Sequence, residues 1–421
     1  MRTSRRQMLG GIVAAACAAR THAGLVAALT VLGAPGEFEH QDYIWLPWVE
    51  RGFFGAEPLS SVVIQVIRSI TPHVRVRLLY SGQQPIHTGG AEPPLLTKAA
   101  AEERLRALLA ASAVDLDRVE LIFHELAYGA IQDPGPYFLR TAQGLAVADY
   151  RLNHPDPRAE AMDRTLAAAI GLPSIQSRLV SEGGARQSNG RGILLLSRVV
   201  EQVRNPGWSL ADIEAEHLRV HGARKIVWLE RGPADEEWGK LTDGRWGIGT
   251  GGHVDVFARF ANPSTILLAE VSRVQRETHA IMAETHERME RNFDLLRAAS
   301  DQNGQPFTII RVPVPDPIIA SIESDQINVA ERSWLPGARA GGTIEYYLPA
   351  SYLNFIIANG VVVSCRLHGP GLGERFRETD RQAMQVLEQA FPGRRILQIE
   401  VTPLLHGGGG LHCHSRNQPK V

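Results

Sequence analysis

The feature of this sequence that most restricts its fold is a regular alternation of short apolar runs and helix-forming segments. Pairs of runs rich in valine, isoleucine and leucine each precede one helix-forming segment, and this pattern recurs roughly five times along the chain. For example, Val254–Phe260 and Ile266–Glu270 are predicted to be strands, followed by a helix over Glu277–Ala299 and a strand over Phe307–Val312. This order predicts an α/β fold with mixed sheets.

Segments near both ends of the chain are also predicted to be short strands and helices. Val62–Ile67 and Val74–Tyr80 are rich in valine, isoleucine and leucine and are predicted to be two strands. Near the C-terminus, Thr379 is predicted to cap a helix over Asp380–Phe391, and Ile396–Val401 to form a buried strand. No internal repeat can be aligned by eye, so the pattern specifies a fold class but no architecture.

The composition narrows the range of functions. The chain has 421 residues, 44% of them hydrophobic, which is enough to bury a large core. Its formal net charge of −1 gives no electrostatic reason to expect a nucleic acid partner.

Residues 1–36 are interpreted as a signal and a linker. Paired arginines, Arg5-Arg6, precede the apolar stretch Met8–Ala19, and this arrangement resembles a twin-arginine export signal. The stretch is shorter than the ~20 apolar residues that a membrane-spanning helix needs. We therefore expect an exported protein, periplasmic or secreted, with residues 24–36 as the linker. A lipoprotein signal ending at Cys17 and an ordinary basic N-terminus are the alternatives.

The chain has three cysteines, and one of them is a candidate nucleophile. Cys413 follows four consecutive glycines, Gly407–Gly410, whose lack of a Cβ allows close approach of chain or ligand. A cysteine placed after a buried strand and a glycine turn suits a nucleophile at a cavity wall, although a structural cysteine in a flexible tail is the alternative. Cys365 follows an apolar run and is expected in the core, and both cysteines are expected to be free thiols.

Six segments, taken in order, resemble the agmatine deiminase and bacterial peptidylarginine deiminase family of the guanidino-group-modifying (pentein) superfamily. Each segment alone is a weak signal, but together they extend over nearly all of residues 37–421, which we interpret as one deiminase catalytic domain. The segments are Glu37-Phe38-Glu39 with Trp45-Leu46-Pro47-Trp48, Asp133-Pro134-Gly135-Pro136, Glu182-Gly183-Gly184, Gly252-His253-Val254-Asp255, Ser351–Phe355, and Gly407–Cys413 with Asn417-Gln418-Pro419.

The resemblance implies an architecture and a set of roles. The implied fold is a five-bladed α/β propeller of ββαβ units around a central channel that contains the active site. Cys413 would attack the guanidinium carbon and form a covalent thiouronium, and His253 would protonate departing ammonia and then activate water. Asp133 and Asp255 would hold the guanidinium nitrogens, and Glu182 would orient the substrate or the imidazole. No cofactor and no metal are implied.

Each of these residues also has an ordinary structural interpretation. Asp133 before Pro134 could begin a turn, and Glu182 could be a solvated acid in a loop. His253 and Asp255 would share one face of a strand, where a surface histidine and a salt-bridging aspartate are the alternative. His412 and His414 suggest a metal site, but strand alternation would place them on the face opposite Cys413.

The sequence departs from the family pattern around the site. Ala130, Gln132 and Gly251 stand where the family has tryptophan, arginine and aspartate, and Arg186-Gln187 follows the EGG motif in place of isoleucine and histidine. Because the five catalytic residue types are retained, we expect the chemistry to be retained. The changed residues around them indicate a substrate that differs from that of the typical family member.

The leading hypothesis is hydrolysis of a guanidinium to a ureido group, with agmatine as the preferred substrate and N-carbamoylputrescine as the product. The substrate argument rests on Asp156, which takes the place of an arginine in the carboxylate-gripping segment of peptidylarginine deiminases. An aspartate there would attract an amine and repel a terminal carboxylate. Peptidylarginine deimination, amidinotransfer and a non-catalytic guanidinium-binding protein are the alternatives.

Overall fold

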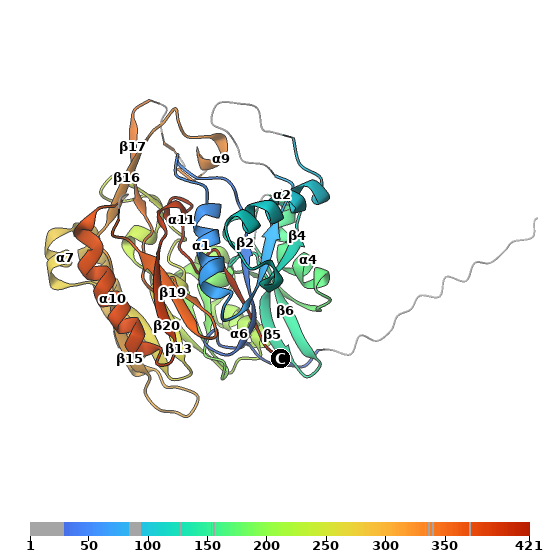
Figure 1. Cartoon of the computed structure of the whole chain (residues 1–421). Helices are drawn as coiled ribbons and strands as arrows, with labels where there is room; N and C mark the ends of the chain where they lie inside the picture. Colours follow the sequence, from blue (N-terminus) through green and yellow to red (C-terminus); the bar gives the residue numbers. More distant parts are fainter. Residues whose placement is uncertain are drawn as a thin grey trace, which may run out of the picture.

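The computed structural model describes residues 29–83, 94–126, 128–152, 154, 156–332, 334–335, 337–338, 341–369 and 372–421. The predicted export signal and Cys17 lie outside these residues. The chain forms a mixed α/β fold built from small separate sheets (Figure 1). In the part of the chain that is described, no helix is both long and apolar enough to span a membrane.

Five sheets in the described residues share one pattern, in which a central strand has an antiparallel neighbour on one side and a parallel neighbour on the other. A helix connects the two parallel strands in each case. The five units are β21 (Arg416–Pro419), β2 (Gln41–Pro47), α1 (Ser60–Ile70) and β3 (Arg75–Tyr80); β5 (Tyr137–Thr141), β6 (Gly144–Arg151), α4 (Met162–Ala169) and β7 (Ser174–Val180); β8 (Arg186–Ser188), β9 (Ile193–Ser197), α6 (Leu210–His221) and β10 (Lys225–Leu229); β13 (Ala258–Asn262), β14 (Thr265–Glu270), α8 (Ala280–Ala298) and β15 (Thr308–Pro313); β18 (Ile356–Ile357), β19 (Val361–Arg366), α10 (Arg377–Ala390) and β20 (Arg395–Glu400).

The connecting helices pack between units. Helix α10 contacts β15 of the preceding unit, α8 contacts β10, α6 contacts β7, and α1 contacts β20 of the last unit. The predicted alternation of strand pairs and helices is therefore confirmed.

The remaining elements extend or connect these units. A sixth sheet has the strand order β11-β12-β17-β16 and projects at the top of Figure 1 with α9. The additional elements are β1 (Val31–Gly33), β4 (Val119–Phe123), β11 (Trp238–Lys240), β12 (Trp246–Ile248), β16 (Ile318–Glu323), β17 (Thr343–Leu348), α2 (Lys98–Ala111), α3 (Pro157–Glu160), α5 (Arg198–Arg204), α7 (Arg273–Thr278), α9 (Val329–Arg332) and α11 (Thr402–His406).

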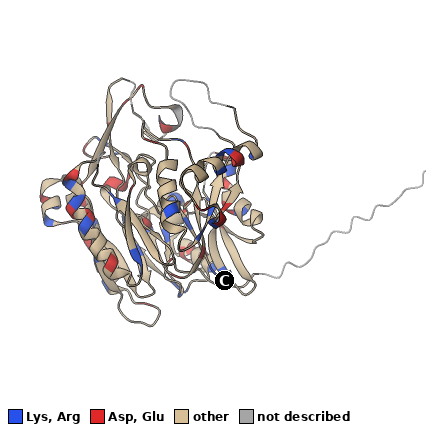
Figure 2. Cartoon of the chain, viewed as in Figure 1, with Lys and Arg blue, Asp and Glu red and all other residues tan. Residues whose placement is uncertain are grey.

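Charged side chains of both signs are interspersed over the helices, as Figure 2 shows for α10. This mixture agrees with the small net charge.

Four predicted elements differ in the structure. Val62–Ile67 lies in helix α1, where Val62, Val63, Val66, Ile67 and Ile70 form one buried face with helical spacing. The predicted helix over Glu277–Ala299 is two helices, because α7 begins at its own Ser272 capping box and the backbone of His279 is extended. Thr379 lies inside α10 and does not cap it. The predicted linker 24–36 contains β1, which pairs with β5.

Candidate active site

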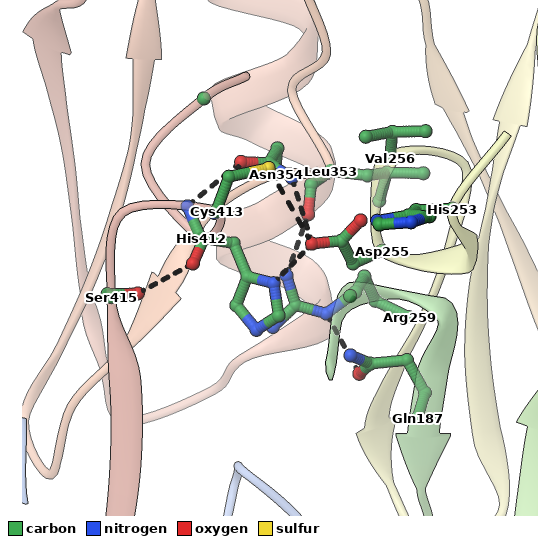
Figure 3. Close-up of polar contacts among 12 residues, drawn as sticks. Gln187, His253, Asp255, Val256, Arg259, Leu353, Asn354, His412, Cys413 and Ser415 are labelled. Atoms are coloured by element: carbon green, nitrogen blue, oxygen red, sulfur yellow. Dashed lines mark hydrogen bonds and ion pairs between the residues drawn. The ribbon is translucent and has the colours of Figure 1, made fainter. Parts of the chain in front are cut away.

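Cys413 lies in a turn between α11 and β21. The turn is so tight that a Cβ on Gly409 would lie 2.9 Å from Cys413 Sγ, so a larger residue would displace the thiol. The Cys413 thiol is buried, accepts a hydrogen bond from Asn354 Nδ2 at 3.3 Å and lies 3.9 Å from Asp255 Oδ2 (Figure 3). Burial, Asp255 and Asp133 raise the pKa of this thiol well above its ordinary value. Without a bound cation, the thiol is therefore protonated at neutral pH.

Asp255 lies in a short 3-10 helix, Val254–Val256, and His253 immediately precedes that helix, so neither residue lies in a strand as predicted. His253 Nδ1 lies 3.6 Å from Asp133 Oδ1, and His253 Nε2 lies 3.7 Å from Glu182 Oε2. Burial by itself lowers the pKa of His253, but Asp133, Glu182 and Asp255 outweigh it and raise this pKa to about 9. At neutral pH the imidazole is therefore protonated and can donate a proton.

Gly184 is the point where three of the predicted site residues meet. A Cβ on Gly184 would lie 2.8 Å from His253 Nδ1, 3.1 Å from Asp255 Oδ2 and 3.2 Å from Asp133 Oδ1. The backbone N–H of Gly184 donates to Asp133 Oδ1 at 3.1 Å. Only glycine fits in this space, and the two carboxylates and the imidazole converge because it has no side chain.

Glu182 joins the same cluster through an ion pair. Its Oε1 accepts a hydrogen bond from Arg204 Nε at 2.5 Å, and Arg204 also donates to the carbonyl of Thr250. Burial raises the pKa of Glu182, but His253 and Arg204 lower it to about 2. Burial also raises the pKa of Asp133, which Glu182 and Asp255 raise further and His253 lowers. The structure thus brings Asp133, Glu182, His253, Asp255 and Cys413 together.

A buried charge network behind Asp255 was not predicted from the sequence. His412 Nδ1 lies 2.6 Å from Asp255 Oδ2, and His412 Nε2 lies 2.9 Å from both carboxylate oxygens of Glu37. Glu37 in turn accepts from Arg259 Nη2 at 2.5 Å. His412 lies in a turn and not in a strand, so it points toward Asp255 as Cys413 does. No group of three potential metal ligands is found among the described residues.

Asn354 was also missed, although it lies within the Ser351–Phe355 motif. Its Nδ2 donates to both Asp255 Oδ2 and Cys413 Sγ, and its Oδ1 accepts from the backbone N–H groups of His412 and Cys413. Asn354 therefore fixes the distance between the thiol and the aspartate. The Ser351–Phe355 motif marked Asn354 as a candidate site residue. Its hydrogen-bond partners could not be predicted from the motif, because Asp255, His412 and Cys413 lie far away in the sequence.

A cavity of about 710 Å³ reaches this cluster. Its lining includes the buried Glu182 and His253 with Asp133 beside them, which define what we call its inner end, and Gly407 and Gly408 of the turn before Cys413. The remaining described lining residues are Tyr128, Leu152, His154, Val180, Val203, Arg204, Pro206, Trp238, Ile248, Gly249, Thr250 and Trp334. The dimensions suit a small organic ligand, since such sites measure ~300–1,000 Å³.

The structure does not bring Asp156 to this cavity. Asp156 caps α3 and forms an ion pair with Arg158, whose Nη2 donates to Asp156 Oδ2 at 2.6 Å. Arg158 holds the pKa of Asp156 at about 2. Its charge is balanced locally, so the predicted attraction of a substrate amine by Asp156 has no basis in the structure. The sequence pattern failed here because a local ion pair between residues two apart cannot be distinguished from a ligand contact.

The departures from the family pattern have structural partners. Gln132 is fully buried, and its backbone N–H donates to the carbonyl of Cys413 at 3.0 Å. Gln187 accepts from Arg259 Nε at 3.0 Å, and Arg186 lies over the ring of Tyr150. Gly251 has a positive φ of 82° and donates its N–H to the carbonyl of Glu236. Ala130 accepts a backbone hydrogen bond from Asp133.

The geometry defines a class of site, in which a buried cysteine, a histidine with a raised pKa and three carboxylates lie together at one end of a cavity. Residues 33–419 match the family described as Porphyromonas-type peptidyl-arginine deiminase, and the chain belongs to this family. It is therefore a deiminase-type hydrolase, a class that acts on C–N bonds of linear amidines.

Relatives and solved structures agree with this assignment. A candidate agmatine deiminase of Streptomyces coelicolor is 30% identical over 72% of this chain and 79% of its own length. The fold is similar to that of the agmatine deiminase of Enterococcus faecalis, with a TM-score of 0.70, 19% identity and coverage of 93% and 96% of the two chains. It is also similar to a candidate arginine deiminase of Porphyromonas gingivalis, with a TM-score of 0.66, 21% identity and coverage of 91% and 97%.

Proposed function

We propose that this protein hydrolyses a guanidinium group to a ureido group and ammonia, with Cys413 as the nucleophile. The observation that carries the proposal is the convergence of Asp133, Asp255 and His253 on Gly184, with Cys413 Sγ 3.9 Å from Asp255. Asp133 lines the cavity and Asp255 is buried next to it, and two such carboxylates match the paired hydrogen bonds of a guanidinium. No other common cation combines this planarity with so many donors.

Binding and activation are coupled in this proposal. Asp133 and Asp255 keep the pKa of the Cys413 thiol high while the site is empty. A guanidinium bound between the two carboxylates neutralises them, so the pKa of the thiol falls and its proton is released to solvent. The nucleophile is therefore generated where a cation is already present, and an empty site holds an unreactive thiol.

The reaction then proceeds in two halves with His253 as the proton carrier. The Cys413 thiolate forms a bond to the guanidinium carbon, and the protonated His253 gives its proton to one amino group, which leaves as ammonia. A positively charged S-alkylthiouronium remains. Neutral His253 next takes a proton from water, and the hydroxide adds to the same carbon. The C–S bond breaks to regenerate the thiolate, and the hydroxyl proton is released to solvent as the ureido product forms.

Agmatine is the small substrate that we propose, giving N-carbamoylputrescine, because relatives over most of the chain bear names of agmatine deiminases. The family description favours arginine side chains of peptides as the second candidate. Incubation with agmatine, free arginine and arginine peptides, with mass detection of ureido products, tests the proposal. Ammonia without a transferred amidine would exclude an amidinotransferase, and absence of any product would leave a guanidinium-binding protein.

We also infer that the five ββαβ units form a propeller around the catalytic channel. The inference is supported by the contacts of α10, α8, α6 and α1 with the neighbouring units, because these contacts link the units in a closed order. Helix α1 of the first unit contacts β20 of the last, and β21 contacts β5. A crystal structure that placed the units in an open row would contradict this arrangement.

We further propose that the N-terminal segment preceding β1 directs export of the protein by the twin-arginine route. The proposal rests on Arg5-Arg6 and the apolar stretch that follows. Replacement of both arginines by lysine is expected to leave the protein in the cytoplasm, which cell fractionation would detect. Unchanged recovery outside the cytoplasm would exclude this route.

A further inference from the structure

The two ends of the 710 Å³ cavity differ in chemistry. At the inner end, Asp133 and Glu182 lie against His253. Towards solvent, Val203 is 64% exposed and Trp238 is 55% exposed, so these side chains form the rim. Among the described lining residues, Asp133 and Glu182 are the only carboxylates, and both belong to the inner end.

The rim carries a fixed aromatic surface. Trp238 comes from β11, and its Nε1 donates to the carbonyl of Trp334 at 2.9 Å. Trp334 stacks on Phe53, with ring centroids 5.1 Å apart and an interplanar angle of 22°. These contacts hold both indoles in place before a ligand binds, so little side-chain entropy is lost when an apolar group packs on them.

The charged groups near the rim do not favour a second cation. Arg204 is positively charged, and its partners are Glu182 and the carbonyl of Thr250. His154 Nδ1 accepts a hydrogen bond from the N–H of Asp156 at 3.0 Å, so this nitrogen is occupied within the chain. The nearby Asp156 is paired with Arg158. In the described part of the rim, the ammonium of agmatine would therefore lose water without gaining a carboxylate.

We infer that the rim is a second subsite, which binds a neutral aromatic or aliphatic group attached to the guanidine-bearing chain. This inference rests on the proposed deiminase function and narrows its substrate class from agmatine itself to N-acylated agmatines and related guanidinoalkyl amides, with agmatine as the weaker substrate. The guanidinium occupies the inner end, the alkyl chain follows the cavity, and the acyl group packs on Trp238, Trp334 and Val203.

The first experiment compares agmatine with N-benzoylagmatine, in which the amine is acylated and the charge is lost. The kcat/KM of N-benzoylagmatine is expected to exceed that of agmatine by ten-fold or more. Benzoylarginine with its free carboxylate serves as a third substrate. An equal or higher kcat/KM for agmatine or for benzoylarginine would overturn the inference.

Two variants test the rim directly. Trp238→Ala is expected to reduce the ratio of the two kcat/KM values, benzoylagmatine over agmatine, by about five-fold or more, because stacking area is lost. Val203→Glu adds a carboxylate at the rim and is expected to shift the same ratio toward agmatine by about ten-fold. Val274→Glu is the matched control, since Val274 is 67% exposed on α7 and lies outside the cavity lining. A ratio that is unchanged in both rim variants, or changed equally in the control, would refute the subsite.

Binding measurements separate this inference from the proposed function. The Cys413→Ser variant removes the nucleophile, and calorimetry then gives the Kd of each compound without turnover. Tighter binding of N-benzoylagmatine than of agmatine by this variant would support the subsite even if the wild type formed no product. Weaker binding would overturn the subsite even if the wild type deiminated both compounds.

Discussion

Two cysteines of this protein are equally buried, and only one lies at the candidate site. Cys413 and Cys365 are each 4% exposed and both are free thiols. Burial is the largest cause of a raised pKa at both. Cys365 lies in β19, with its Sγ 3.5 Å from the carbonyl of Ser351, among core side chains. Cys413 lies beside Asn354 and Asp255, next to a turn that lines the cavity.

The comparison shows that burial and thiol pKa do not distinguish a nucleophile from a core residue. The difference lies in what a ligand can change. In the proposed mechanism a guanidinium neutralises Asp255 and Asp133 and so lowers the pKa of Cys413, which follows a turn that lines the cavity, whereas Cys365 lies in β19 among core side chains. Reactivity is therefore expected where a substrate can change the charge beside the thiol.

The largest effect is expected when the two thiols are replaced in turn. Cys413→Ser should reduce turnover by roughly a thousand-fold or more, because a serine hydroxyl has no nearby base able to ionise it. Cys365→Ser should keep most of the activity while lowering the free energy of unfolding by about 1–3 kcal/mol, since it buries a hydroxyl among apolar groups. Steady-state assays and denaturant unfolding measure the two quantities.

A guanidine-mimicking haloacetamidine probe gives an independent check on the same pair. It should label Cys413 in the wild type and leave Cys365 unmodified. Equal labelling of both, or full activity of Cys413→Ser, would remove the assignment of the nucleophile.

The next effect concerns the proton donor. His253→Ala should lower kcat by roughly a hundred- to a thousand-fold with a smaller change in KM, because proton transfer to the leaving group matters in the transition state. The pKa of His253 of about 9 predicts that kcat/KM of the wild type falls above that pH, as the imidazole loses its proton. A near-normal kcat in the alanine variant would contradict this role.

Glu182→Gln tests the cause of that pKa. Glu182 raises the pKa of His253, so the amide variant should move the alkaline fall of kcat/KM to lower pH. Asp133 and Asp255 remain in this variant and still raise the pKa of His253. The alkaline fall of kcat/KM should therefore move less than it would if all three carboxylates were removed. An unchanged pH profile would mean that another group sets the alkaline limb.

Much of the fold could be predicted from the sequence, because alternation of apolar runs and helices depends on short-range pattern. The prediction failed for Val62–Ile67, whose β-branched residues suggest a strand. In α1 those side chains pack against β19 and β20, and this tertiary contact outweighs a weak local preference. The β1 strand of Val31–Gly33 was missed because its pairing with β5 depends on a residue far along the chain.

The site residues could be identified one by one through family motifs, but their partners could not. Asn354 and Glu37 lay in motifs without an assigned role, and His412 was considered only as a metal ligand. Their contacts join residues more than fifty positions apart, as in the pair of His412 with Glu37. The prediction that Asp156 contacts the substrate was wrong for the opposite reason. Its actual partner, Arg158, is only two residues away, and the sequence does not show how far Asp156 lies from the cavity.

His412 lies behind Asp255, one of the carboxylates that distinguish the surroundings of Cys413 from those of Cys365. Both of its ring nitrogens face carboxylates, Nδ1 that of Asp255 and Nε2 that of Glu37. His412→Gln should lower kcat/KM by about ten-fold, mainly through KM, because Asp255 loses a charge-assisted hydrogen bond of ~1.5–3 kcal/mol. Glu37→Gln is the control, since it leaves the bond between His412 and Asp255 in place. Equal changes in KM for the two variants would show that His412 does not position Asp255.

The smallest effect on activity is expected when Glu236 is replaced. Glu236 is a buried acid like those of the site, but it does not line the cavity. Burial, Asp235 and Asp255 raise its pKa to about 8, and it is separated from the cavity by Gly249. Because the unfolded chain ionises this group near 4.5, the folded state binds the proton more tightly. Stability contributed by the neutral acid is therefore complete below about pH 4.5 and is lost as the pH rises to about 8.

Glu236→Gln keeps the shape of the side chain and removes the ionisation. At pH 5 the variant and the wild type should unfold at similar temperatures, while at pH 8 to 9 the variant should be more stable by a few kcal/mol. Its kcat/KM at neutral pH should stay within about two-fold of the wild type, since the acid lines neither end of the cavity. Thermal unfolding across this pH range measures the first quantity. A stability difference that did not change with pH would show that Glu236 is already ionised in the folded protein, and that a cation or donor compensates its charge.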